Sequence, residues 1–131
     1  MISRPLSTLV ALVPLLAIGC GSSQPLPMAT TPELSRQALV LALDGWKAGK
    51  AVNDLSSGSP AVLFVDSDIT RGDRLLDYRI EGQPQPHGTG YRYAVMLNLQ
   101  SRPGARPITK SVAYIAVTQP RYAVTREDPS S

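Results

Sequence analysis

TPELSRQALVLALDGWKAGK, residues 31–50, is the stretch that decides the fold. Thr31 can accept hydrogen bonds from the first free amides of a helix, Pro32 suits the first turn, and an acidic residue follows at the positive end of the helix dipole. Gly49 suits the position just after a helix. We therefore expect a helix over residues 33–50. Its apolar face, widened by Leu39 and Leu43, is expected to consist of Leu34, Ala38, Leu41, Ala42 and Trp46.

After a short turn predicted at residues 51–55, the hydrophobic period changes from helical spacing to the alternation of β-strands. Residues 109–119 are apolar on both faces, which is typical of a central strand. Pro120 predicts a bulge or bend. Turn-rich stretches at 67–73, 82–90 and 101–107 separate the predicted strands. These strands are residues 61–68, 73–82, 91–100, 109–119 and 121–127, and in the third of them Tyr91, Tyr93, Val95, Leu97 and Leu99 share one face.

One helix followed by consecutive strands with short links predicts an α+β fold. We expect one long N-terminal helix packed on a curved antiparallel sheet of four to five strands. This order resembles the cystatin-like and NTF2-like folds, and ALDGWKAGKAVNDL, residues 42–55, resembles the first helix of NTF2-like domains. The body, with VDSD, RGDRLLDYRI and VAYIAVTQPRYAVTRED, is similar to small uncharacterised bacterial lipoproteins. That resemblance implies a fold and no reaction.

The single cysteine of the chain directly follows its longest apolar run. Residues 1–7 carry Arg4 and polar side chains, and residues 9–18 are apolar apart from one proline. This run has the length of a signal-peptide core and is too short to span a bilayer. LAIGC, residues 16–20, resembles the lipobox of bacterial lipoproteins, although Ala17 stands where leucine is commoner. The resemblance implies cleavage between Gly19 and Cys20 and acylation of Cys20.

Several acyl chains on one residue anchor a protein stably, whereas a single chain does so only marginally. The expected organisation is a signal peptide at 1–19, a lipidated cysteine and flexible tether at 20–31, one α+β domain at 32–128 and a disordered tail at 129–131. The partner so implied is a membrane, on its extracytoplasmic side. Gly21 in place of aspartate favours the outer membrane, facing the periplasm, in a Gram-negative cell. An ordinary secretory signal with an incidental cysteine is the alternative.

The charge pattern and the remaining polar residues point to no reaction. The net charge is +3, but the thirteen basic residues are scattered, so we expect no nucleic-acid partner. One cysteine and one histidine, His87, exclude an internal disulfide and metal sites rich in these residues. Asp66, Asp68 and Asp73 resemble the start of a calcium loop, but Arg71 stands where that loop needs glycine. We expect these aspartates to cap backbone amides, and we expect no catalytic, metal or cofactor site.

Six aromatic residues leave two interpretations open. They line a ligand-binding face, or they fill the core between helix and sheet. These residues are Trp46, Tyr78, Tyr91, Tyr93, Tyr114 and Tyr122.

The leading hypothesis for function is a non-catalytic extracytoplasmic binding or scaffold domain that meets an envelope protein or its own copy through a sheet face or edge. The alternative is a small-molecule binder or minor enzyme that uses the concave face of an NTF2-like sheet. A third possibility is an orphan secreted protein with no present role.

Overall fold

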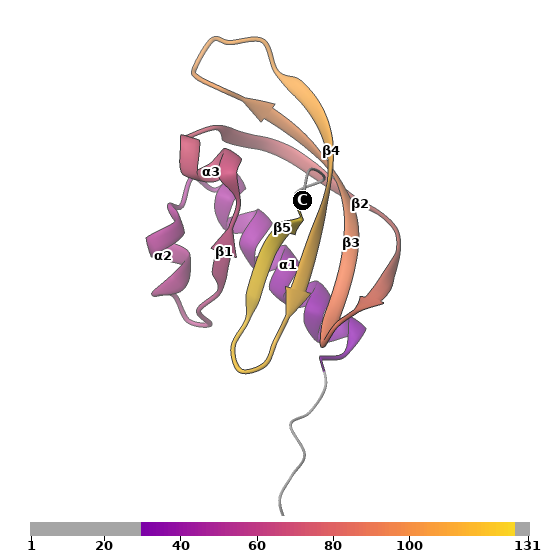
Figure 1. Cartoon of the computed structure of the whole chain (residues 1–131). Coiled ribbons are helices and arrows are strands. Elements are labelled where there is room, and N and C mark those ends of the chain that lie inside the picture. Colours follow the sequence, from indigo (N-terminus) through magenta and orange to yellow (C-terminus); the bar gives the residue numbers. More distant parts are fainter. Residues whose placement is uncertain (1–29, 128–131) are drawn as a thin grey trace, which may run out of the picture.

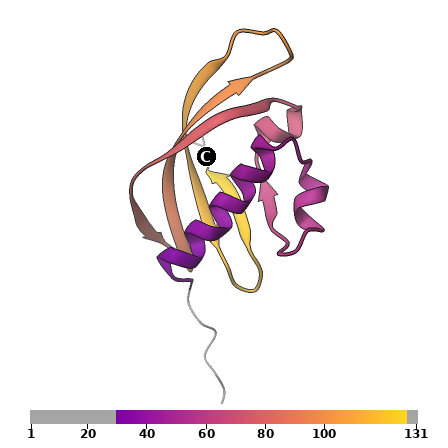
Figure 2. The same cartoon turned by 180° about the vertical axis from the view of Figure 1, so that it is seen from behind.

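The computed structural model describes residues 30–127, which form an α+β fold with helix α1 packed against one face of a five-stranded mixed sheet (Figure 1). Figure 2 shows α1 crossing this face diagonally. The predicted signal peptide, Cys20, most of the tether and the tail lie outside the described residues. The elements are α1 (Pro32–Lys47), α2 (Val52–Ser56), β1 (Leu63–Val65), α3 (Ser67–Arg71), β2 (Arg74–His87), β3 (Gly90–Gln100), β4 (Ile108–Val117) and β5 (Ala123–Glu127).

Helix α1 begins and ends with the chemistry expected from the sequence. The Thr31 hydroxyl accepts a hydrogen bond from the Leu34 amide at 3.1 Å, and Pro32 occupies the first turn. Helical structure stops at Lys47, three residues before the expected end, and Gly49 takes the left-handed conformation with φ 90°. The short turn expected at 51–55 is helix α2.

The strands run in the order β1-β5-β4-β3-β2, so β4 is central as predicted. The expectation of an antiparallel sheet is wrong in one respect, because β1 pairs with β5 in parallel, with Phe64 opposite Val124. Antiparallel pairing of β2 to β5 leaves the outer edges of β2 and β5 free, and the first strand joins the edge of β5. Since β1 joins that edge by a crossover and not by a hairpin, its direction is free to be parallel.

The boundaries of two predicted strands differ from the expected ones by more than two residues. The run at 61–68 forms only the three-residue β1, because Asp66 leaves the strand to cap α3. Strand β2 continues past residue 82 to His87, through a region predicted as a turn. The register with β3 shifts between Glu81 and Gln85. Because β2 is the edge strand, prolines at 84 and 86 are tolerated.

The core lies between α1 and the sheet. The buried face of α1 is centred closer to Leu39 and Leu43 than the sequence predicted. Two residues of the predicted face, Leu34 and Leu41, are only half-buried. The alternation predicted for β3 is confirmed, although Tyr91 at its start is half-buried. Pro120 lies in the turn that reverses the chain from β4 to β5. The largest core side chains are Leu39, Leu43, Trp46, Phe64, Tyr93, Leu97, Leu99 and Tyr114.

Candidate functional site

A group of charged side chains is buried where α3 meets β4 and β5. The strand alternation places Lys110 and Tyr114 of β4 and Arg126 of β5 on the sheet face that α1 covers. The N-terminal end of α3 brings two aspartates to the same place. We call this group the ionic cluster, and it consists of Asp66, Asp68, Arg71, Lys110, Tyr114 and Arg126.

Asp66 holds the cluster to the backbone. It is the N-cap of α3, and its Oδ1 accepts hydrogen bonds from the amides of Asp68 at 2.6 Å and Ile69 at 3.4 Å. The expectation that an aspartate here caps backbone amides is confirmed. The same carboxylate accepts from Arg126 Nη1 at 3.1 Å and from the Tyr114 hydroxyl. Asp66 thereby joins α3 to β4 and β5.

Asp68 is the centre of the charge pairing. Its side chain is 1% exposed and accepts from Lys110 Nζ at 3.0 Å, from Arg126 and from Arg71. Arg71 also reaches Asp73 at 3.0 Å, so three carboxylates face three cations. Arg126 is 13% exposed, and its Nε is the one buried side-chain nitrogen or oxygen within residues 30–127 that has no hydrogen-bond partner.

The pKa shifts follow from this arrangement. Burial works to raise the pKa of Asp68, but hydrogen bonds and charge attraction from Arg126 and Lys110 outweigh it and hold the pKa below its ordinary value. Burial likewise opposes the charge on Arg126, yet Asp68 and Asp66 raise its pKa. Burial and the neighbouring Asp66 carboxylate raise the pKa of Tyr114. At neutral pH the Asp68 carboxylate is therefore charged and the Tyr114 hydroxyl is neutral.

The cluster is built to hold charges in place, because its carboxylate oxygens already accept hydrogen bonds. A general base needs a free oxygen within reach of a substrate proton. A hollow of about 410 Å³ opens beside the cluster, and this is where a ligand could reach it. The hollow is lined by Val65, Asp66, Ser67, Thr70, Arg71 and Arg126.

Five of the six aromatic residues singled out from the sequence do not gather around a pocket, and the sixth, Tyr122, lines a hollow along α1. Trp46, Tyr93 and Tyr114 are at most 3% exposed, and Phe64 lies between Trp46 and Tyr114 with ring centroids about 6 Å from each. Tyr78 and Tyr91 are half-buried at the edge of the core. The Trp46 indole nitrogen donates to the Asp73 carbonyl oxygen at 2.8 Å, and Tyr93 bonds to Ser35 and to the Pro32 carbonyl.

The remaining sequence candidates are not brought together. His87 is the exposed last residue of β2, and Gly19 and Cys20 lie outside the described residues. Between residues 30 and 127, no three histidine, cysteine, aspartate or glutamate side chains are grouped as a metal would require. In the same part of the chain, none of the helices has the length and apolar character needed to cross a bilayer.

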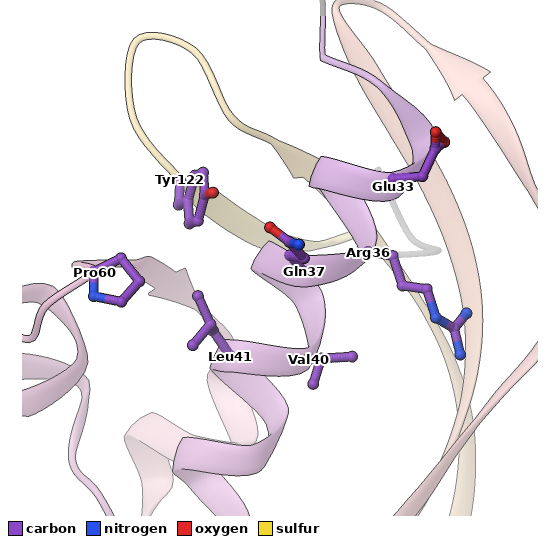
Figure 3. A pocket seen from close by; sticks show the side chains of 7 residues that line it. All are labelled: Glu33, Arg36, Gln37, Val40, Leu41, Pro60 and Tyr122. Atoms are coloured by element: carbon purple, nitrogen blue, oxygen red, sulfur yellow. The ribbon is translucent and has the colours of Figure 1, made fainter.

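Two further hollows are present, and the second of them shares Lys110 and Arg126 with the ionic cluster. The first, about 480 Å³, runs along the exposed side of α1 and is mostly apolar; we call it the α1 groove (Figure 3). Its lining residues are Glu33, Arg36, Gln37, Val40, Leu41, Pro60 and Tyr122. The second, about 600 Å³, lies where β5 ends and β4 continues, and is lined by Gln83, Gln85, Arg92, Ala94, Lys110, Ser111, Val112, Ala113, Arg126 and Glu127.

Sequence reasoning missed the ionic cluster, although a signal for it was present. In the alternation of a β-strand, Lys110 falls on the same face of β4 as Tyr114, and Arg126 falls on the same face of β5 as Val124. Both cations therefore lie on the buried face of their strands. A charged residue at such a position predicts a buried partner of opposite charge. Asp66 and Asp68 continue the buried phase of Phe64 in the same way.

Comparison of the chain with models of known protein families, with curated proteins and with solved structures gives no match.

Proposed function

We propose that this protein is a lipid-anchored extracytoplasmic domain that binds or scaffolds another molecule without covalent chemistry. One observation carries the proposal: the lipobox-like stretch ending at Cys20 is followed, after only nine residues, by a folded domain. Thr30 is buried, and its hydroxyl oxygen accepts from the Thr118 amide at 3.0 Å. Ten residue steps separate Cys20 from Thr30, so Thr30, the start of the domain, stays within about 36 Å of the anchor at Cys20.

The geometry of the ionic cluster supports a binding role over a catalytic one. Its buried carboxylates already accept hydrogen bonds from arginine, lysine, tyrosine and backbone amides. Such an arrangement stabilises a fixed structure, because moving a proton or a substrate into it breaks bonds already made.

The partner surface that we propose is the β1 edge of the sheet. Leu63 and Val65 are 36% and 50% exposed there, beside a strand edge. The opposite edge, β2, carries Pro84 and Pro86, which hinder the addition of a further strand. An envelope protein or a second copy of this chain is the partner expected at β1, in the periplasm at the outer membrane if the cell is Gram-negative.

For the finer fold we propose a cystatin-like or NTF2-like domain. The order of the elements supports this, because a capped helix precedes a run of antiparallel strands and lies across one face of their sheet.

The test is the mass of the mature N-terminus in a membrane fraction. We expect a peptide that begins at Cys20 and carries acyl chains, and we expect Cys20→Ala to abolish the adduct and release the protein from the membrane. Recovery of unmodified protein in the soluble fraction would contradict the proposal. Cross-linking in intact cells tests the proposed binding role. A binding domain gives a reproducible cross-linked adduct, and Val65→Glu should weaken it.

A second candidate function is binding of a small molecule at the hollow beside the ionic cluster. The observation that favours it is the position of Arg71 and Arg126 on the wall of this hollow together with the hydroxyls of Ser67 and Thr70. A panel of metabolites in a thermal-shift assay tests it. A stabilising compound whose effect is lost in Ser67→Ala would support this function, and a panel without effect would count against it.

A further inference from the structure

The α1 groove lies at the end of the domain where the chain enters it. Glu33 is in the first turn of α1, Tyr122 closes the β4–β5 connection, and Pro60 is in the loop before β1. Figure 2 shows these three segments at one end of the domain, with the β3–β4 hairpin at the other. Thr30 is bonded to Thr118 in the same β4–β5 connection. The groove and the point of attachment therefore share one end.

The chemistry of the groove is that of a surface between water and hydrocarbon. Pro60, Tyr122, Gln37 and Leu41 lie around a common hollow (Figure 3), and Val40 of α1 also lines it. Leu41 and Tyr122 pack against the core on one side and remain partly exposed on the other.

Two cations accompany this apolar surface. Arg36 is exposed on α1, and Arg121 directly precedes Tyr122 and is also exposed. Tyrosine beside apolar side chains, with basic residues nearby, is the combination found at the headgroup level of membranes, where the cations meet lipid phosphates.

We propose that the α1 groove rests on the phospholipid surface of the membrane that holds Cys20, an inference that rests on the proposed lipid anchor. The ten residue steps between Cys20 and Thr30 keep Thr30, at the same end of the domain as the groove, within about 36 Å of the bilayer. Contact is then an intramolecular event at high effective concentration, so a weak interfacial affinity suffices to keep the groove docked. Docking directs the β3–β4 hairpin away from the membrane.

The test uses the acylated full-length protein in vesicles of mixed zwitterionic and anionic phospholipid. Cys20 is the only cysteine, so once it is acylated a new cysteine takes a spin label selectively. Gln37→Cys places the label in the groove, and Arg102→Cys places a control in the β3–β4 hairpin. We expect the Gln37 label to be relaxed more by oxygen than by a water-soluble nickel complex, and the Arg102 label to show the reverse. With Val40→Glu added, the Gln37 label should become accessible to the nickel complex, whereas with the matched Val65→Glu it should stay protected.

Three results overturn the proposal. Equal exposure of both labels to the nickel complex means that the groove stays in water. Protection of the Gln37 label in membrane-free Cys20→Ala protein means that the chain itself covers the groove. Spin–spin broadening that grows with protein density means that a second copy covers it. An unmodified Cys20, seen by mass before any vesicle is made, refutes instead the anchor on which the inference rests.

Discussion

Replacement of Asp68 by asparagine tests the energetics of the ionic cluster. The substitution keeps the size of the side chain and removes the charge that Arg126, Lys110 and Arg71 share. Arg126 is 13% exposed, so loss of its charge-assisted bond costs about 1.5–3 kcal/mol. Lys110 is one-third exposed and regains part of its hydration, and the 59% exposed Arg71 contributes little because water screens its charge. We expect a total loss of about 3–5 kcal/mol, the range for breaking a buried ion pair.

The assay is urea unfolding followed by the fluorescence of Trp46, the single tryptophan, which is buried in the core. The matched control is Asp77→Asn, which removes an exposed pair with Lys47 at 3.3 Å and should cost much less than Asp68→Asn, because water screens this pair. A loss of about 3 kcal/mol is a large part of the 5–15 kcal/mol typical of a whole domain. Equal losses in the two variants would show that the cluster is not a strong source of stability.

Three further outcomes follow from other contacts. Because the pKa of Asp68 is lowered in the folded protein, its contribution to stability is present above the ordinary value of 3.8 and is lost as the pH falls through the folded value. The free energy of unfolding at pH 2–5 should therefore depend less on pH in Asp68→Asn than in the parent protein. Gly90→Ala places a Cβ 2.3 Å from a β4 carbonyl oxygen and should cost about 1–3 kcal/mol, whereas Gly58→Ala, with its nearest neighbour at 3.4 Å, should cost less in the same urea assay. Thr30→Val leaves the buried Thr118 amide without its acceptor and should cost about 1–3 kcal/mol, with faster hydrogen exchange at that amide.

The parts of the fold that could be predicted are those set by local chemistry. Thr31 and Gly49 mark the ends of α1 because a cap and a left-handed residue act within one turn. The face of β3 could be read because Tyr93 to Leu99 alternate without interruption and the strand is half-buried. The position of β4 in the middle of the sheet follows from apolar residues on both its faces.

The parts that could not be predicted depend on distant segments. Pro84 reads as a turn residue, and it lies in a strand only because β2 is at the edge of the sheet. The pairing of β1 with the outer edge of β5 depends on where the later strands leave a free edge. The ionic cluster depends on this pairing, since Asp66 meets Arg126 only after β1 has paired with β5.

This dependence also suggests what the cluster does for the fold. Strand β1 has three residues and joins β5 without a hairpin, so neither its length nor a turn sets its register. A shift by one residue would turn Phe64 out of the core, but a shift by two would keep the alternation. Such a shift moves Asp66 about 7 Å along β5, given a rise of about 3.3 Å per residue, and leaves its buried charge without Arg126. The cost of an unpaired buried charge therefore disfavours the two-residue shifts, in either direction, that the hydrophobic alternation alone allows, and the cluster fixes β1 and α3 against β5.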